Sequence, residues 1–188
     1  VTVIGVGLIG GSLARALRHY GVAGEVVGVE PDSGTLERAR QRGLIDRGVT
    51  EPAAAVAGAD LVVLAVPVGS FATVLAAIAP HLEAEVLVTD VGSVKAPAQA
   101  DAERLLGAAA VFIGGHPIAG TEDSGVDAAL GDLFRGAPCV LAPTEASPAW
   151  AVERLRAAWE AIGSEVVTMT PAEHDRVLAA TSHLPHML

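Results

Sequence analysis

One histidine and one glycine-rich turn carry most of the chemistry that this sequence predicts. The segment GGHPIAGTEDSGV, residues 114–126, places His116 among glycines, hydroxyls and carboxylates. An imidazole with the ordinary histidine pKa of about 6.5 exchanges protons near neutral pH, so this segment predicts a general base. The chain opens with VTVIGVGLIGG, in which Gly5, Gly7 and Gly10 have the spacing G-x-G-x-x-G. That spacing, between a strand and a helix, is typical of a site for a dinucleotide pyrophosphate.

An acidic residue at the end of the next predicted strand supports the dinucleotide interpretation and favours NAD. Glu30 ends the run EVVGVE, 25 residues after Gly5. A carboxylate there accepts hydrogen bonds from the adenosine ribose and repels the 2′-phosphate of NADP. Pro31 and Asp32 follow where an arginine would favour NADP. A glycine turn that serves only packing is the alternative. The predicted NAD contacts share strand ends and the first helical turn: Gly5, Gly7, Leu8, Ile9, Gly10, Glu30, Val66, Pro67, Asp90 and Ser93.

A second chemical motif, VTDVGSVK at residues 88–95, is predicted at the carboxyl end of a later strand. Parallel sheets bind ligands at that edge, so Ser93 and Lys95 are expected to point into the cleft near the nicotinamide. Lys95 is the only lysine of the chain, and it could instead pair with a nearby acid. Asp90 is expected to shape the loop rather than act as a catalytic acid.

The elements that position these motifs follow from the alternation of Val-rich runs with segments rich in Ala, Leu and Arg. We predict strands at 1–5, 25–30, 61–66, 85–90, 111–115, 138–142 and 165–168, and helices at 9–20, 33–42, 70–80, 96–106 and 148–162. The early strands are almost continuously apolar, as expected when helices cover both faces of a sheet. The predicted fold is α/β, a Rossmann-type doubly wound, mainly parallel sheet. Its rim would bring Gly7, Ser93 and His116 into one site; a histidine bonded only within its own loop is the alternative.

Composition limits the classes of partner. The 188 residues include 22 acidic and 12 basic ones, a formal net charge of −10. The basic run RARQR at 38–42 is predicted to be a solvated helix face, so no nucleic-acid site is expected. No apolar run approaches the roughly 20 residues of a spanning helix and no signal peptide is evident, so we expect a cytoplasmic protein without a membrane segment. Cys139 is expected to be a buried thiol, and the six dispersed histidines predict no metal site.

A new helical pattern, PAEHDRVLAATSHLPHML, begins at Pro171 and is still in progress at Leu188. We therefore expect two parts. Residues 1–170 would form the NAD-binding domain, and 171–188 would be the first helix of a helical domain that is otherwise missing.

Four motifs in this order resemble the prephenate dehydrogenases, a family that includes arogenate and cyclohexadienyl dehydrogenases. They are GVGLIGGS, DVGSVK, GGHPIAGTEDSG and SHLPH, and together they extend over the whole chain. The middle two are far more specific than the glycine spacing. The resemblance implies NAD-dependent oxidative decarboxylation of prephenate to 4-hydroxyphenylpyruvate in tyrosine biosynthesis. One departure is Glu30, where many relatives have aspartate, so the preference for NAD over NADP is less strict.

The resemblance also implies roles for particular residues. His116 would accept the proton of the substrate ring hydroxyl, and Ser93 would orient that hydroxyl and His116. His183 would shape the substrate pocket, with Thr121 and Glu122 at its mouth, and Lys95 is included among the substrate-binding residues. A C-terminal helical domain would form a homodimer and supply an arginine for a substrate carboxylate. We therefore expect the 188-residue chain alone to bind NAD but to turn over prephenate poorly.

Three other interpretations stay open at this stage. An arogenate dehydrogenase would use the same chemistry on a substrate with an amino group in place of the keto group. A β-hydroxyacid dehydrogenase or imine reductase would use Lys95 as its central catalytic group and would leave His116 without a role. An NAD-binding regulatory module would leave the histidine loop unexplained.

Overall fold

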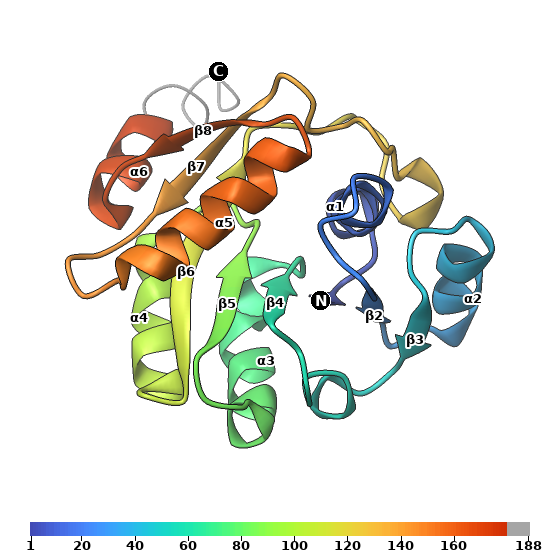
Figure 1. Ribbon diagram of the computed structural model, residues 1–188, viewed down its shortest axis with the longest axis horizontal. Helices are drawn as coiled ribbons and strands as arrows, with labels where there is room; N and C mark the ends of the chain where they lie inside the picture. The colour runs from blue at the N-terminus through green and yellow to red at the C-terminus, as the bar shows by residue number, and fades with distance from the viewer. Residues whose placement is uncertain (180–188) are drawn as a thin grey trace.

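One eight-stranded sheet organises the chain in the computed structural model, which describes residues 1–179. The strand order is β3-β2-β1-β4-β5-β6-β7-β8 (Figure 1). The strands are β1 (Thr2–Ile4), β2 (Val27–Val29), β3 (Arg47–Val49), β4 (Leu61–Leu64), β5 (Val86–Asp90), β6 (Ala110–Pro117), β7 (Pro138–Ala142) and β8 (Glu165–Thr168). The order changes direction at β1, so the crevice of a doubly wound fold lies beside the carboxyl end of that strand.

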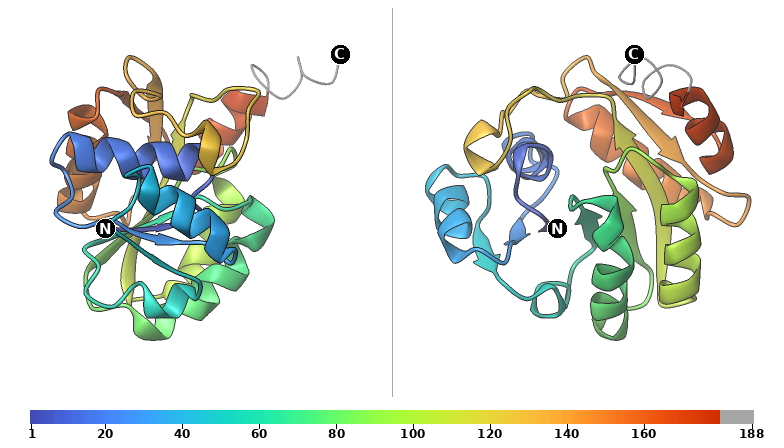
Figure 2. Two further views of the ribbon diagram at one scale, coloured as in Figure 1. Left: turned by 90° about the vertical axis from the view of Figure 1, so that its right-hand side faces the viewer. Right: turned by 180° about the vertical axis from the view of Figure 1, so that it is seen from behind.

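Helices cover both faces of the sheet, as the apolar strands predicted. They are α1 (Leu8–His19), α2 (Ser33–Gln41), α3 (Phe71–Ile78), α4 (Ala96–Leu106), α5 (Ala149–Ala161) and α6 (Pro171–Leu178). Leu17 of α1 and Trp159 of α5 share one buried cluster with Val3 of β1. Phe71 of α3 and Ala102 of α4 belong to a second cluster, on the other face. Figure 2 shows α3 and α4 in front when the molecule is seen from behind. The predicted Rossmann-type, doubly wound architecture is confirmed.

The sheet is parallel from β3 to β6, and its last two strands run the other way. β6 pairs antiparallel with β7, with Gly114 opposite Ala142, and β8 then runs parallel to β7. The prediction of a mainly parallel sheet is confirmed. β6 extends to Pro117, beyond the expected end at residue 115, and the short strand β3 was not predicted. β3 comprises only Arg-Gly-Val and is mostly exposed, so its sequence carries no apolar run.

Short helical turns complete the connections: η1 (Pro52–Ala54), η2 (Val68–Ser70), η3 (Ala79–His81) and η4 (Val126–Ala128). The start of α6 is fixed by a capping box. The Thr170 hydroxyl accepts from the Glu173 N–H while the Glu173 carboxylate accepts from the Thr170 N–H, with Pro171 in the first turn. The helix packs against α4 and β7.

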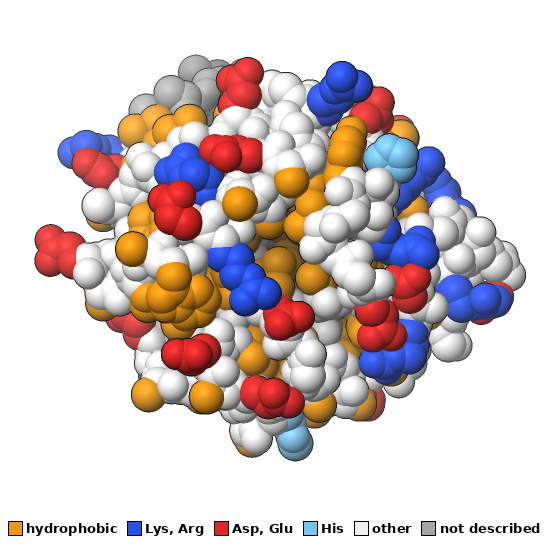
Figure 3. All heavy atoms as spheres, in the orientation of Figure 1, with side chains coloured by type: hydrophobic (Ala, Val, Ile, Leu, Met, Phe, Trp, Pro, Cys, Tyr) orange, Lys and Arg blue, Asp and Glu red, His pale blue; other side chains and the backbone are white. Residues whose placement is uncertain are grey.

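The surface carries charges of both signs. Figure 3 shows acidic and basic side chains interspersed over one face, without a single-sign field there. An anionic ligand would therefore depend on local N–H groups and individual cations, as the net charge of −10 already indicated. In the part of the chain that the structure describes, none of the helices has the length and apolar character needed to cross a bilayer.

Candidate active site

The glycine turn after β1 has the shape that its sequence predicted. Gly5 has a positive φ of 96°, and its N–H donates to the Val29 carbonyl oxygen at 2.8 Å. A Cβ at Gly5 would overlap the carbonyl of Ala65, and one at Gly10 would overlap the carbonyl oxygen of Gly5. These two glycines are required by packing between β1, α1 and the end of β4. The turn therefore places the N-terminus of α1 at the edge of the sheet formed by the carboxyl ends of the parallel strands.

Gly7 differs from its neighbours because nothing lies within 4 Å of a Cβ built there. Packing within the protein does not require glycine at this position. The space beside the turn is a cavity of about 460 Å³, lined among others by Gly7, Glu30, Val66 and Pro67. Leu8 and Ile9, in the first turn of α1, are half-buried and directly follow Gly7. A pyrophosphate at a helix N-terminus needs this open approach, so the residues fit a bound dinucleotide.

Glu30 lines this cavity, directly after β2. Its carboxylate accepts weakly from the Val6 N–H, at 3.4 Å, and its own N–H donates to Val49 at 3.2 Å. The unpredicted strand β3 therefore holds the Glu30 backbone in place. Asp32 is used locally, since its side chain accepts from the Gly34 and Thr35 N–H groups and caps α2.

The structure corrects two expectations about the second motif. Lys95 does not point into the cleft, because its side chain is 0% exposed and its ammonium group contacts Asp90 and donates to the Gly115 carbonyl oxygen at 2.6 Å. Asp90 was expected to contact the cofactor, but its carboxylate is also 0% exposed. It accepts from the N–H groups of Gly92 at 2.8 Å and Gly115 at 3.1 Å. Asp90 and Lys95 therefore form a buried ion pair, the buried staple, which joins the end of β5, the loop after β5, and β6.

Burial dominates the protonation of both partners. Desolvation raises the pKa of the Asp90 carboxyl, and the charge of Lys95 opposes that shift. Desolvation likewise lowers the pKa of the Lys95 ammonium, and the charge of Asp90 opposes it. Each charge is therefore tolerated in the interior only because the other is present.

His116 is the next-to-last residue of β6, and its side chain is at the carboxyl edge of the sheet, the edge where the glycine turn also lies. The two glycines before it are required by packing. A Cβ at Gly115 would lie 2.7 Å from the Asp90 carbonyl oxygen, and one at Gly114 would lie 3.0 Å from the Lys95 side chain. The buried staple therefore fixes the strand segment that carries the histidine.

Two site residues were missed by sequence reasoning. The His116 Nδ1 atom lies 2.8 Å from the Nε2 atom of His174, which is 0% exposed on α6. The His174 Nδ1 atom lies 2.8 Å from a carboxylate oxygen of Asp175. The motif TPAE at residues 170–173 signals a helix start before His174, but no sequence feature places that helix beside His116, 58 residues earlier in the chain.

Asp175 is held at the start of α4. Its two oxygens accept from the backbone N–H groups of Lys95 at 2.7 Å and Ala96 at 2.9 Å. Desolvation alone would raise its pKa, but these backbone bonds and the bond from His174 outweigh it and lower the pKa of this carboxyl. Asp175 is therefore a carboxylate at neutral pH.

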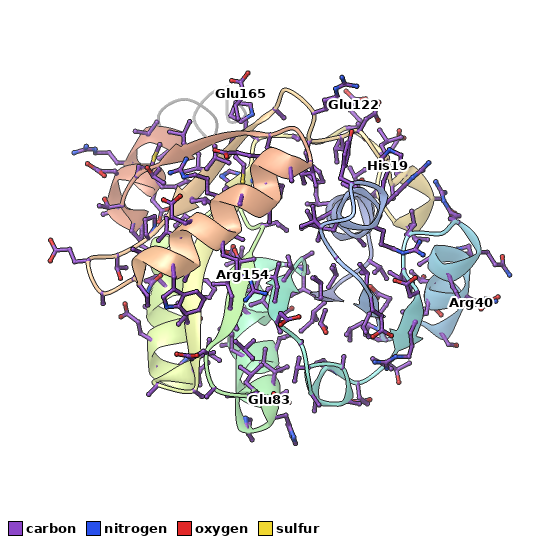
Figure 4. All side chains as sticks on the ribbon, viewed as in Figure 1. His19, Arg40, Glu83, Glu122, Arg154 and Glu165 are labelled. Carbon is purple, nitrogen blue, oxygen red and sulfur yellow. The ribbon has the colours of Figure 1, made fainter. Side chains whose placement is uncertain are left out.

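For the other predicted residues that it describes, the structure gives a position on the molecule but no contact with a site. Ser93 is exposed in the loop between β5 and α4, on the edge that carries the glycine turn. Thr121 and Glu122 are exposed on the loop after β6, where the Thr121 hydroxyl accepts from the Asp123 N–H at 3.2 Å. Figure 4 shows Glu122 at the periphery of the molecule. His183 lies outside the described residues. The substrate roles of these four residues remain predictions.

Cys139 does not offer a reactive thiol at this edge. Cys139 is fully buried on β7, and burial raises the pKa of its thiol to about 12, as expected of a structural thiol. Across residues 1–179, no group of three or more His, Cys, Asp and Glu side chains is arranged to hold a metal ion.

The fold and the edge together define a dinucleotide-binding domain of the Rossmann class, with a histidine at the carboxyl end of β6. Residues 13–168 match the sequence profile described as prephenate dehydrogenase, nucleotide-binding domain. The chain belongs to the prephenate dehydrogenase family, and the predicted resemblance is confirmed.

Individual relatives agree with this assignment. The chain is 39% identical to the cyclohexadienyl dehydrogenase of Zymomonas mobilis over its whole length, which covers 64% of that protein. It is 34% identical to the prephenate dehydrogenase of Bacillus subtilis and covers 51% of it. The crystal structure of the Aquifex aeolicus prephenate dehydrogenase superposes with a TM-score of 0.92 at 37% identity, over 99% of this chain and 67% of that one. The chain thus spans about half to two thirds of the curated relatives named here.

Proposed function

We propose that the protein binds NAD and catalyses the oxidative decarboxylation of prephenate to 4-hydroxyphenylpyruvate. The observation that carries the proposal is the position of His116, the next-to-last residue of β6, on the edge of the sheet where the glycine turn opens its cavity. A related structure, the Aquifex aeolicus prephenate dehydrogenase, was solved with hydroxyphenyl propionate and NAD+ at 37% identity. A cofactor and a phenolic ring can therefore occupy one molecule of this fold.

The chemistry needs little from the protein beyond position and proton removal. Bound NAD supplies the hydride acceptor. His116 takes the proton of the ring hydroxyl while the ring carbon that bears this hydroxyl is oxidised. The carboxylate on the opposite ring carbon then leaves as carbon dioxide, and the electron pair of the broken bond makes the ring aromatic. His116 returns its proton to the phenolate oxygen, so the reaction needs no further acid.

The geometry does not favour the alternative with Lys95 as the catalytic group. Its ammonium group is buried against Asp90 and Gly115 and is not in the cavity. Arogenate remains a second candidate substrate, since the chain is 38% identical to a Synechocystis arogenate dehydrogenase with a TM-score of 0.91. We include a homodimer through a C-terminal helical domain, and an arginine from that domain, in the same proposal. The further length of the curated relatives supports this part.

The direct test is reduction of NAD by the full-length protein with prephenate and, separately, with arogenate. We expect absorbance at the reduced-nicotinamide wavelength to rise with prephenate, together with release of one carbon dioxide for each NAD reduced. Reduction with arogenate alone would reassign the substrate. No reduction with either substrate, despite NAD binding, would contradict the proposed reaction.

Glu30→Gln tests the cofactor assignment. The variant keeps an oxygen for the Val6 N–H but loses the charge that favours a ribose hydroxyl and repels a 2′-phosphate. We expect the Kd for NAD to rise about tenfold, equivalent to roughly 1.4 kcal/mol, and the Kd for NADP to fall. Titration calorimetry measures both. Glu25→Gln, before the opposite end of β2, should change neither, and equal effects of the two variants would contradict a ribose contact for Glu30.

A further inference from the structure

The contacts behind His116 form a continuous chain of three side chains. His116 Nδ1 lies 2.8 Å from His174 Nε2, and His174 Nδ1 lies 2.8 Å from the carboxylate of Asp175. That carboxylate is fixed by the backbone N–H groups of Lys95 and Ala96, so its place does not depend on the histidines. His174 is fully buried between its two partners. The order of donors and acceptors along this chain can therefore be worked out.

The order of donors and acceptors is fixed first at Asp175. Its oxygens accept from two backbone N–H groups, and a carboxylate has no proton to donate. The His174 Nδ1 atom must therefore carry the proton of its hydrogen bond to Asp175. A neutral His174 then has an unprotonated Nε2 atom, which can only accept a hydrogen bond.

We propose that His174 and Asp175 are positioning residues that hold His116 in the tautomer with its proton on Nδ1. His116 Nδ1 donates to His174 Nε2, and the lone pair of His116 is consequently on Nε2, the ring nitrogen not used in this bond. That tautomer is the one able to take a proton from a ligand hydroxyl. The inference deepens the proposed function of His116 and rests on it for its catalytic meaning, but the tautomer itself is a property of the protein alone.

The opposite order of donors and acceptors would give His116 the other tautomer. If His174 carried protons on both nitrogens, its Nε2–H would donate to His116 Nδ1, and His116 would hold its proton on Nε2. The base would then be blocked. The proposed order places one proton in each of the two hydrogen bonds of the chain and keeps both rings neutral. The charged groups of Lys95 and Asp90 are paired with each other.

Two substitutions of His174 separate the proposal from a purely structural role. His174→Gln can direct its amide N–H to Asp175 and its amide oxygen to His116 Nδ1, so it preserves the order of donors. His174→Phe fills similar volume but offers His116 no acceptor. Both variants should be made in the full-length protein, with NAD affinity and thermal unfolding as checks that each one folds.

The decisive measurement is the ¹⁵N NMR spectrum of the ring nitrogens of His116, at a pH where the ring is neutral. We expect Nδ1 protonated and Nε2 bare in the native protein and in His174→Gln, and a shift toward protonated Nε2 in His174→Phe. A native His116 protonated on Nε2 would overturn the proposal, whatever substrate the enzyme takes. So would an unchanged tautomer in a folded His174→Phe variant.

Turnover provides the second readout. If the proposed reaction holds, kcat should fall by about 10²- to 10⁴-fold in His174→Phe, as expected for loss of a general base, with little change in the KM for NAD. His174→Gln should recover most of kcat. Equal losses in the two variants would contradict positioning through hydrogen bonds. Absence of turnover in the native protein would instead count against the proposed function, and the NMR result would still decide the tautomer.

Discussion

His116→Asn is expected to lower kcat with prephenate by about 10²- to 10⁴-fold, the usual contribution of a positioned general base. Asparagine can still hydrogen-bond to His174 and to a ring hydroxyl, but it cannot accept a proton. The substitution leaves the glycine turn, the cavity beside Gly7 and Glu30 untouched, because His116 is on a different strand. The Kd for NAD should therefore be unchanged.

Stopped-flow or steady-state NAD reduction measures the loss of kcat, and titration calorimetry measures NAD binding. His81→Asn is the matched control, because His81 is exposed in η3, at the end of the molecule where β5 begins. It should leave both quantities at their native values. A His116→Asn enzyme that retains more than about a third of native kcat would contradict the assignment of His116 as base, since such a loss is below 1 kcal/mol.

The parts of the fold that the sequence predicted are those whose local signal and tertiary role coincide. The apolar strands β1, β2, β4 and β5 lie between two layers of helices, so their composition indicates their burial directly. β3 has no such signal, because it is an exposed edge strand of three residues whose role is to hold Glu30. The antiparallel direction of β7 was also not evident, since composition does not encode the direction of a strand.

In the candidate site too, residues with a local sequence signal were predicted and residues without one were missed. The glycine turn, Glu30 and His116 were predicted because each belongs to a local motif at a strand end. His174 and Asp175 were missed because their role depends on the packing of α6 against α4, a contact between distant segments. Lys95 was assigned to the cleft because nothing in its motif distinguishes an inward from an outward lysine. What decides its direction is the space left by Gly114 and the carbonyl of Gly115, across the sheet on β6.

The same geometry predicts the largest effect on stability. Lys95→Met should lower the free energy of unfolding by about 3–5 kcal/mol, the usual cost of removing one partner from a buried ion pair. Methionine fills the space of the lysine stem but leaves the Asp90 carboxylate without its cation and the Gly115 carbonyl without that donor. Burial already raises the pKa of Asp90, and loss of Lys95 removes the main charge that opposes this shift. The carboxyl in the variant will therefore take up a proton well above the ordinary carboxyl pKa.

This protonation gives the variant a pH dependence of defined sign. Between the ordinary carboxyl pKa of about 4 and the raised pKa of the folded variant, the folded state binds more protons than the unfolded state. Stability of Lys95→Met relative to the native protein should therefore fall as pH rises through this interval, and the deficit should narrow as pH is lowered toward 4. Urea unfolding at several pH values measures both the deficit and its slope.

Two further variants show whether the unpaired charge, rather than the lost lysine stem, is responsible. Asp90→Asn combined with Lys95→Met removes both charges, and it should recover much of the lost stability, because a neutral pair of similar volume has no ion to desolvate. Arg104→Met breaks an exposed pair with Asp101, at 2.6 Å, and should cost less than about 1 kcal/mol. If Lys95→Met cost no more than Arg104→Met, the pair with Asp90 would not be the staple that holds β6 and its histidine against the end of β5. A double variant as unstable as Lys95→Met would mean instead that the hydrogen bonds to Gly92 and Gly115, not the charges, hold this edge together.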